Sequence, residues 1–533
     1  MRPLTLRDII GPIMVGPSSS HTAGALHVAA MVRNLLDGEP RRVRFTLYGS
    51  FARTGSGHGT DKALVAGILG LHSDDTRIRQ SFDLARQAGV AIEFENDFDT
   101  DAGHPNTVDI WAESKRGSAV EARGVSIGGG AAKLTRINGI DVDVTGEFNS
   151  MIVHQVDVPG ILSHISGCLA EHGINIATMT LHRTAKRADA FTVLQIDDPV
   201  CPEVVDEILS HPSIKSVRLI PADSLGRSAA SEVTFDRAAA EDRFQEVDFA
   251  RCSELLAYCM QHGLALSEGF MVREHAWLAT QGADAEVTES YLRRVLEVMR
   301  ASTEPDPGEK PLGGLIGGES RKLRALAEAH AGVCDEQSAL LSANAMGVLE
   351  TNASMGRIVA APTAGASGVL PAVLFTLQKT KGYSDDALCR ALESAAAIGY
   401  FIARNATVAG AEGGCQAEVG AASAMAAAAA VELAGGTPRM CLDAAANAIA
   451  NLLGLVCDPV AGLVQVPCQK RNAAAAANAL ISADAALAGI TNLVPFDETV
   501  SAMYEVGTAL PSELRETSLG GLAACPSACK FCL

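Results

Sequence analysis

Three cysteines in the stretch from Asn405 to Asn472 constrain this chain more than any other feature of its sequence. Cys415, Cys457 and Cys468 stand far apart, in surroundings rich in glycine and alanine. A structural zinc site would instead show a close C-x2-C pair at each end. Three thiolates that meet in the fold would ligate three irons of a cubane cluster and leave the fourth iron open, whereas an electron-transfer cluster normally takes four protein ligands. The pattern therefore favours chemistry at an open iron, in a fold that brings distant loops together.

The chain from residue 246 to residue 533 predicts a large all-α domain, because it combines abundant alanine with helical periodicity. Helices rich in alanine pack their backbones closely, which predicts a compact bundle whose glycine-bearing loops carry the chemistry. The expected helices cover 251–266, 284–301, 320–350, 385–404, 416–434, 439–454 and 471–488.

Length and composition limit the remaining choices. A chain of 533 residues is too long for one core and should divide into two to four domains. A hydrophobic content of 48% indicates a well-buried globular protein, and a formal charge of −19 argues against nucleic acid or an anionic membrane as partner. The scattered cysteines and the lack of a signal peptide predict a reduced cytoplasm, and no apolar run is long enough to span a membrane.

Residues 1–148 predict an α+β domain with two histidine-bearing turns. The segment P-S-S-S-H-T contains Ser18, Ser19 and Ser20 and leads into a helix near His21 that ends at Gly38. Hydroxyls and free backbone N–H groups at a helix start suit a carboxylate, although the same residues also make plain N-caps.

A second glycine-rich turn, G-H-G-T-D, follows a predicted strand and opens another helix with His58 and Asp61. A single histidine at a helix start is more often a cap or a surface residue. Two such turns in one domain are harder to explain in that way, so we treat both as candidate parts of a site.

Residues 149–222 change to a different periodicity, with the predicted order βαββαβ. The D-x-P-G at the first turn and the H-G-I-N-I after the first helix resemble an ACT domain, a module that commonly binds amino acids at subunit interfaces. A structural spacer or a dimerisation unit is the alternative interpretation. Residues 223–245 are polar and aperiodic and predict a linker.

The chain as a whole resembles the bacterial iron-sulfur L-serine dehydratases, with both parts of the enzyme fused and the ACT-like unit between them. The resemblance rests on M-G-R-I-V-A-A-P-T-A-G-A-S-G-V-L-P, E-G-G-C-Q-A-E-V-G and C-D-P-V-A-G-L-V-Q-V-P-C, and on the turns P-S-S-S-H-T and G-H-G-T-D. Long strings in the expected order make it specific.

The resemblance implies a [4Fe-4S] cluster on Cys415, Cys457 and Cys468 and a reaction that converts L-serine to pyruvate and ammonia. His21 and His58 are then the candidates for base and substrate contact, because imidazole titrates near neutral pH. A carboxylate near the cluster or a deprotonated hydroxyl is the alternative base. The residues expected to contact substrate are Ser18, Ser19, Ser20, Thr22, Asp61, Thr363 and Ser367.

The last residues of the chain contain Cys525, Cys529 and Cys532 in C-x3-C-x2-C spacing. Radical S-adenosylmethionine enzymes hold a cluster with this spacing, but only one residue follows it here, so no barrel can be built after it. The tail is expected either to supply a fourth cluster ligand that substrate displaces or to lie on the surface.

Competing functions belong to other classes. A hydro-lyase for a small hydroxyacid fits an open iron equally well, and a non-enzymatic sensor of amino acids and oxygen is a third option. A pyridoxal phosphate enzyme would need a Schiff-base lysine beside a phosphate-binding loop, a pairing the sequence does not indicate. The expected partners are L-serine, an amino-acid effector at the ACT-like unit, and further copies of the chain in a homodimer or higher oligomer.

Overall fold

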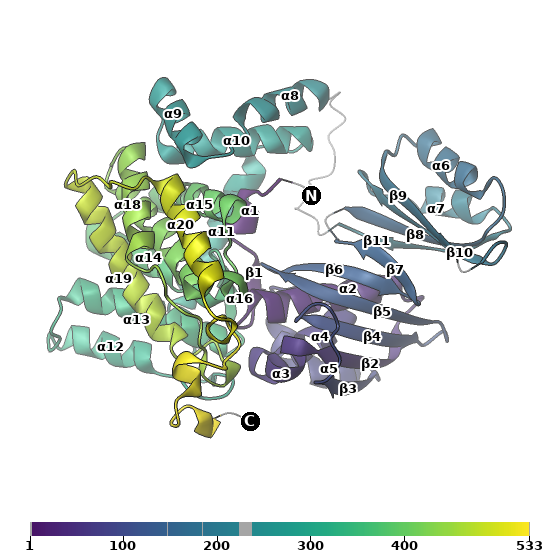
Figure 1. The fold of residues 1–533 in the computed structure, drawn as a ribbon, viewed down its shortest axis with the longest axis horizontal. Coiled ribbons are helices and arrows are strands. Elements are labelled where there is room, and N and C mark those ends of the chain that lie inside the picture. The colour runs from purple at the N-terminus through teal and green to yellow at the C-terminus, as the bar shows by residue number, and fades with distance from the viewer. Residues whose placement is uncertain (1–2, 147, 184, 223–236, 532–533) are drawn as a thin grey trace.

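The computed structural model of the chain describes residues 3–146, 148–183, 185–222 and 237–531. It contains a first α/β part, a small four-stranded part and a large helical part (Figure 1). The expected multidomain architecture, with an α/β region before a large helical region, is therefore confirmed. Within the described residues, no helix combines the length and apolarity needed to cross a membrane.

A six-stranded sheet forms the first part, with its strands in the order β3-β2-β4-β5-β6-β7. β2 and β3 pair in parallel, and the other neighbours pair antiparallel. Burial alternates along β4, the sheet contacts α2 and α3, and α4 packs on α2. The elements are α2 (Ala25–Leu35), β2 (Pro40–Tyr48), α3 (Gly49–His58), α4 (Thr60–Ile68), α5 (Ser81–Gln87), β3 (Ala91–Asp97), β4 (Thr107–Ser114), β5 (Ala119–Gly128), β6 (Ala131–Ile137) and β7 (Ile140–Val144).

The small part has the βαββαβ order that the sequence predicts. Its strands lie in the order β11-β8-β10-β9 and pair antiparallel, and its two helices share a separate hydrophobic core with them. The elements are β8 (Asn149–Val156), α6 (Ile161–Glu171), β9 (Ile176–Arg183), β10 (Asp189–Ile196), α7 (Pro202–Leu209) and β11 (Ile214–Ile220). These four strands form a sheet of their own, and Ile152, Val193 and Ile220 of this sheet pack into the core of the first part.

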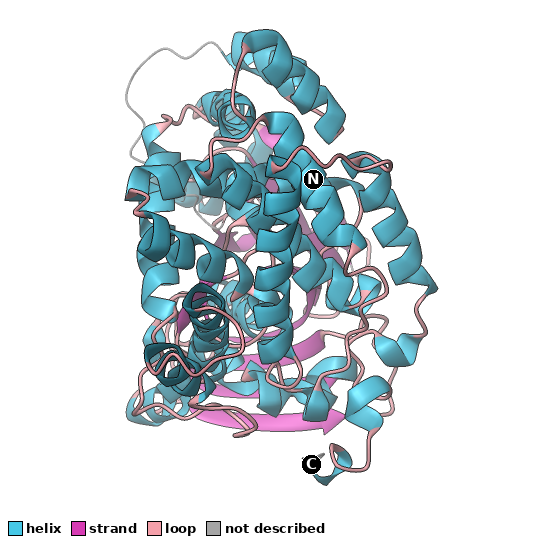
Figure 2. Ribbon diagram, turned by 90° about the vertical axis from the view of Figure 1, so that its left-hand side faces the viewer, coloured by secondary structure: helices cyan, strands magenta, loops and turns pink. Residues whose placement is uncertain are grey.

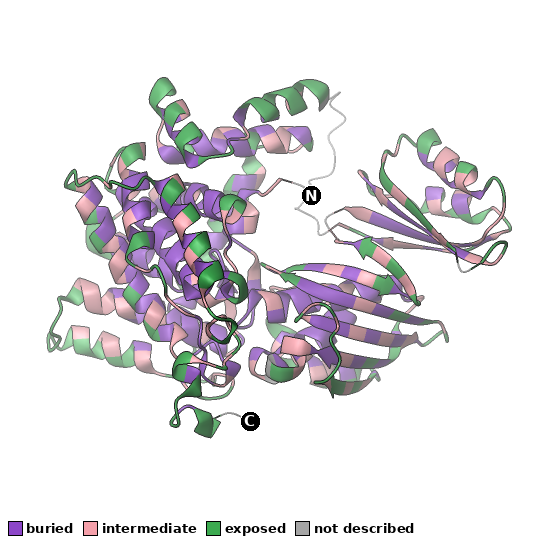
Figure 3. Ribbon diagram, in the orientation of Figure 1, coloured by how far each residue is buried: buried purple, intermediate pink, exposed green. Residues whose placement is uncertain are grey.

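The helical part is built around α17 (Ala421–Leu433), in which every residue from 421 to 431 is buried. Its alanine side chains let α14, α15, α18 and α19 pack directly against it. Figure 2 views the molecule from this side, and Figure 3 shows the burial concentrated at its centre. The other helices are α8 (Arg237–Val247), α9 (Cys252–His262), α10 (Leu266–Thr280), α11 (Glu286–Ser302), α12 (Glu319–Glu328), α13 (Glu336–Ala353), α14 (Val369–Lys381), α15 (Asp385–Asn405), α16 (Gly410–Gly413), α18 (Pro438–Ala450), α19 (Cys468–Leu487) and α20 (Phe496–Ala509).

Several helices differ from the sequence expectation. The range 320–350 forms two helices rather than one, because the chain turns between α12 and α13 and Asp335 caps the second by accepting from the Ser338 N–H. The helices α10, α14 and α20 lie outside the expected ranges. The predicted linker 223–245 runs into α8 from Arg237 onward, and its residues 223–236 lie outside the described residues.

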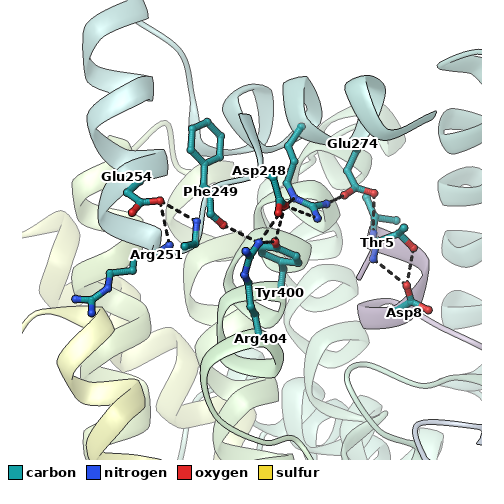
Figure 4. A network of polar contacts seen from close by, with 12 residues as sticks. Thr5, Asp8, Asp248, Phe249, Arg251, Glu254, Glu274, Tyr400 and Arg404 are labelled. Carbon is teal, nitrogen blue, oxygen red and sulfur yellow. Dashed lines mark hydrogen bonds and ion pairs between the residues drawn. The ribbon is translucent and has the colours of Figure 1, made fainter. Parts of the chain in front are cut away.

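The start of the chain packs with the helical part rather than with the six-stranded sheet. The short helix α1 (Leu6–Ile9) contacts α15, and β1 (Ile13–Val15) pairs antiparallel with β12 (Arg357–Val359). This pair makes the helical part an exception to the all-α expectation, because strand β12 finds its ladder partner in the other part of the chain. The fully buried Arg273 lies at the anchor point of α1: it binds Asp248 and Glu274, and Glu274 accepts from the Leu6 N–H (Figure 4). The N-terminal segment therefore ties the two parts together.

Candidate functional site

One large cavity lies between the first part and the helical part. The first part contributes Ser18, Ser19, Ser20 and His21 to its wall, and the helical part contributes Thr363, Glu418 and the three cysteines Cys415, Cys457 and Cys468. The tail of the chain adds Arg515 and Glu516. The structure thus brings the serine-histidine turn and the cysteine loops, far apart in the sequence, to the wall of one cavity.

His21 lies on a π-helical turn, Ser19–Gly24, that leads directly into α2. Ser18 caps this turn by accepting from the His21 N–H at 3.2 Å. Both ring nitrogens have hydroxyl neighbours: Nε2 lies 2.9 Å from Ser50 Oγ, and Nδ1 lies 3.1 Å from Ser20 Oγ. π turns are rare and recur at functional sites. The imidazole is therefore held at both nitrogens while it faces the cavity.

His58 lies behind His21 rather than on the cavity wall. The centroids of the two rings are 4.5 Å apart, and His58 is 2% exposed. Thr22 turns away from the cavity and donates its hydroxyl to the His58 carbonyl at 2.9 Å. Burial, together with the neighbouring His58, lowers the pKa of His21 well below its ordinary value. His21 is therefore neutral at physiological pH and can accept a proton.

Two other predicted contact residues also lie off the cavity wall. Asp61 sits in the first turn of α4, where it accepts from the Lys62 N–H, and burial raises its pKa. Ser367 is fully buried beneath the turn that follows Thr363. Thr363 itself lines the cavity and donates its hydroxyl to Glu418 Oε1 at 2.8 Å. Of the motif A-P-T-A-G-A-S-G, the structure thus presents Thr363 and Gly365 to the cavity.

The three cysteines come from three different local structures. Cys415 immediately precedes a second π turn, Gln416–Gly420, which leads into α17. Cys457 lies in an extended segment bridged to Arg515, and Cys468 begins α19. Burial raises the pKa of all three thiols, that of Cys415 to about 12, and neighbouring carboxyl groups raise it further. Without a cation these thiols stay protonated.

The donor set suits a metal cluster better than a single ion. Among the described residues, no three His, Cys, Asp or Glu side chains converge closely enough to hold one metal ion. A cubane cluster, in contrast, takes each thiolate on a different iron, so its ligands surround a space. The three thiols and the nearby carboxyl groups of Glu418 and Glu516 are an acidic, soft donor set, which suits a cationic iron-sulfur core.

Two carboxylates in the site were missed by the sequence analysis. Glu418 is one turn beyond Cys415, and its Oε2 lies 3.9 Å from Cys457 Sγ. Its position three residues after a candidate ligand, on the same helical face, was the available signal. Glu516 has a strained backbone with a φ of 62°, and burial together with Glu418 raises its pKa to about 8. The aperiodic tail around Glu516 gave no comparable signal.

Arg471 is the cation beside the cysteines. It donates to the Val456 carbonyl at 2.8 Å and to Asp458 Oδ1 at 2.7 Å. Its charge acts to lower the pKa of Cys415 against the effect of burial. Its hydrogen bonds to Val456 and Asp458 hold it in a structural position beside the cysteines.

The two described tail cysteines, Cys525 and Cys529, lie away from the cavity wall. Cys525 and Cys529 are exposed on turns after residue 520, and Cys532 lies outside the described residues. Asp458 Oδ2 accepts from the Leu522 N–H at 2.7 Å, which anchors the tail beside the segment that carries Cys457. Cluster ligation by these cysteines stays a prediction.

Comparison with known proteins gives a consistent family. Residues 8–135 match the model of the serine dehydratase beta chain, and residues 171–523 match that of the serine dehydratase alpha chain. The L-serine dehydratase of Streptomyces coelicolor is 31% identical over 530 residues, which covers 96% of this chain and 96% of that protein. L-serine dehydratase 2 of Escherichia coli is 32% identical over 536 residues and is covered to 98%.

Some relatives divide the same sequence between two polypeptides. The L-serine dehydratase alpha chain of Peptoniphilus asaccharolyticus is 44% identical over 275 residues, covering 51% of this chain and 92% of that protein. The beta chain from the same organism is 40% identical over 202 residues, covering 38% and 91%. The chain therefore belongs to the serine dehydratase family, as a single polypeptide that contains both the beta-chain and the alpha-chain parts.

Proposed function

We propose that the protein is an L-serine dehydratase that converts L-serine to pyruvate and ammonia. The observation that carries this conclusion is the shared cavity, whose wall contains a neutral histidine, serine hydroxyls and the three cysteine thiols. The full-length relatives named L-serine dehydratase support the same substrate.

Cys415, Cys457 and Cys468 would hold a [4Fe-4S] cluster in this cavity. When bound, such a cluster with three protein ligands supplies an open Lewis-acidic iron that assists loss of the serine β-hydroxyl. Its support in this chain is the acidic, thiol-rich wall and the position of all three cysteines on it. Arg471 would offset part of the negative charge that the thiolates add.

The residues of the first part would bind serine and move its proton. The N-terminal N–H groups and the hydroxyls of Ser18, Ser19 and Ser20 suit the substrate carboxylate. His21 would accept the proton from Cα, and the support is its position on the cavity wall and its neutral imidazole. Loss of this proton and of the hydroxyl as water leaves aminoacrylate, which tautomerises and hydrolyses to pyruvate and ammonia. His58 would hold His21 in place from behind.

The test is an anaerobic assay of the reconstituted protein with L-serine, L-threonine and malate in parallel. We expect pyruvate from L-serine as the fastest reaction. Fumarate from malate without turnover of L-serine would instead indicate a hydroxyacid hydro-lyase, and no turnover of any substrate by protein with a full cluster would favour a sensor.

The tail cysteines would supply the fourth ligand of the cluster in the resting enzyme. The support is their spacing and the anchoring of the tail beside Cys457. A chain ending at Ala524 tests this idea. Altered saturation by L-serine and a shorter cluster lifetime in air are expected, whereas unchanged values of both would indicate a surface tail.

Residues 149–222 would form an ACT-like regulatory module. The support is the β11-β8-β10-β9 order of its antiparallel sheet and the positive φ of Gly160 in the D-x-P-G turn. An amino acid bound at this module, in a homodimer or higher oligomer, would regulate the enzyme. Equilibrium dialysis with L-serine and other amino acids, combined with light scattering, measures both properties.

A further inference from the structure

The tip of the loop between Cys457 and Cys468 reaches across to the turn that carries His58. The hydrogen bond from Val460 N–H to the Val466 carbonyl, 2.8 Å long, closes this loop on itself. At its tip, the turn Val460–Gly462 contacts α3, which ends at His58. The loop therefore has a predicted cluster ligand at each end and the histidine turn at its tip.

Leu463 makes the contact through glycines that leave it room. A Cβ atom added to Gly57 would lie 2.8 Å from Leu463 Cδ2, and one added to Gly313 would lie 2.4 Å from Leu463 Cδ1. Both distances are shorter than side chains tolerate, so the leucine fills a slot that only glycine allows on either side. Leu463 is 6% exposed in this slot.

Met355 closes the other side of the same turn. Its sulfur would lie 3.1 Å from a Cβ added to Gly59, and it is 1% exposed. Its backbone adopts a φ of 58°, a left-handed conformation that a residue with a side chain keeps only where the surroundings impose it. The segment Gly57-His58-Gly59 is thus held between a leucine from the cysteine loop and a methionine from the helical part.

The contacts continue from this turn to the cavity. The His58 ring packs 4.5 Å from the His21 ring, measured between centroids, and Thr22 binds the His58 carbonyl. We propose that Leu463 is a positioning residue, which couples the conformation of the Cys457–Cys468 loop to the placement of the His58 and His21 pair. The catalytic meaning of this coupling rests on the proposed function, but the contact itself does not.

This coupling would link binding of the cluster to the position of the histidine turn. When both ends of the loop are tied to a cluster, the tip is fixed and the histidine turn is clamped. When the cluster is absent or lost, the loop is tied only by the protein, and the clamp on His58 loosens. The histidine turn would then be held more firmly when the metal centre is complete than when the cluster is absent.

The test measures the protection of His58 directly, without relying on turnover. Trypsin releases residues 54–62, a peptide in which His58 is the sole histidine, so its carbethoxylation by diethyl pyrocarbonate can be read by mass spectrometry. In Leu463→Ala we expect His58 to react roughly tenfold faster than in the wild type, with or without the cluster. In the wild-type protein, removal of the cluster should raise the rate of His58 modification toward the rate seen in Leu463→Ala.

Two further variants and one control define the result. Leu463→Met keeps the volume and should restore protection, while Gly57→Ala should displace the leucine from the opposite side and expose His58. Leu388→Ala removes a fully buried leucine of α15 and serves as the control for general loss of stability. It should leave His58 protected.

Kinetics of the loaded enzyme provide the second readout. Leu463→Ala should lower kcat for L-serine about 100-fold at unchanged iron content, with a much smaller change in KM, because misplacement of a catalytic group by about 1 Å costs that much. Protection of His58 in Leu463→Ala equal to the wild type would overturn the proposal. If the protein makes no pyruvate but the protection pattern holds, the proposed function fails and the coupling stands.

Discussion

The two sides of the cavity begin with the same local structure but differ in the hydrogen-bond partners of their functional side chains. Ser19–Gly24 and Gln416–Gly420 are both π turns that lead into a long helix, and each places functional side chains on the cavity wall. In the first turn, His21 has hydroxyl neighbours at both ring nitrogens. In the second, Glu418 has one hydroxyl partner, Thr363, and otherwise faces the Cys457 thiol.

This difference indicates which side is complete without a ligand. The histidine side is preorganised by the protein, since its polar groups find partners within the first part. The cysteine side gathers thiols and carboxyl groups whose pKa values burial raises, so it is the side that a cationic cofactor would complete. Substitutions on the two sides should therefore differ in their effects on iron content and on turnover.

The largest effect is expected on the cysteine side. Replacing Cys415, Cys457 or Cys468 by serine should lower both iron content and pyruvate formation, the latter by about 1,000-fold or more, because the open iron of the proposed cluster would supply the main assistance to hydroxide loss. Iron assay and turnover on the same anaerobic samples measure both. Cys441→Ala, at a buried position of α18, is the matched control and should retain both. Full iron content and full activity in all three serine variants would contradict a cluster on these cysteines.

The histidine side should lose activity without losing metal. His21→Gln should lower kcat by about 100- to 10,000-fold, the usual contribution of a general base, while iron content stays at the wild-type value. His275→Gln, at an exposed position of α10, is the control. A His21→Gln variant that loses its iron would show that the two sides are not separable.

Loss of the hydrogen bond from Thr363 to Glu418 should lower activity less than loss of His21 or of a cysteine. Thr363→Val keeps the shape but removes the hydrogen bond to the carboxylate, and we expect kcat/KM to fall about tenfold. Thr363→Ser should recover most of the loss because it restores the hydroxyl. Equal losses in the valine and serine variants would instead assign the effect to packing.

The pH dependence of stability tests the preorganised side. The pKa of His21 is lowered in the folded protein, so below pH 6.5 the unfolded chain binds more protons than the folded one, and stability falls as the pH drops. His21→Gln should flatten this fall between pH 6.5 and 5. Urea unfolding midpoints at pH 5.5, 6.5 and 7.5 give the slopes. A slope unchanged by the substitution would mean that His21 is not the buried neutral group described here.

Sequence patterns predicted the parts of the fold that carry a strong local period. Apolar residues recur with a helical period around Ala421–Leu433 and alternate with polar residues along the strands of the small part. The structure contains both the helices and the strands. The pairing of β1 with β12 could not be predicted, because strands of three residues show almost no period and their partners lie in different parts of the chain. The π turns at Ser19 and Gln416 were predicted as helix starts, since periodicity does not reveal one wider turn.

The candidate site was predicted in its chemistry more than in its geometry. The motifs gave His21, Ser18–Ser20, Thr363 and the three cysteines, which the structure places on one cavity wall. They could not separate these residues from Thr22, His58, Asp61 and Ser367, which lie behind that wall, because neighbours in a motif point in different directions. Glu516 reaches the site through the path of the tail, which only the fold determines.

The central claim is that the three cysteines hold a cluster in the cavity that His21 lines, and that L-serine can bind its fourth iron. Mössbauer spectra of anaerobic, 57Fe-reconstituted protein, recorded with and without L-serine, test it most directly. The account predicts about four irons per chain, one of which changes its spectrum when L-serine is added, as expected for three protein ligands on a cubane. Protein that binds no iron, or irons that are all unaffected by L-serine, would contradict it.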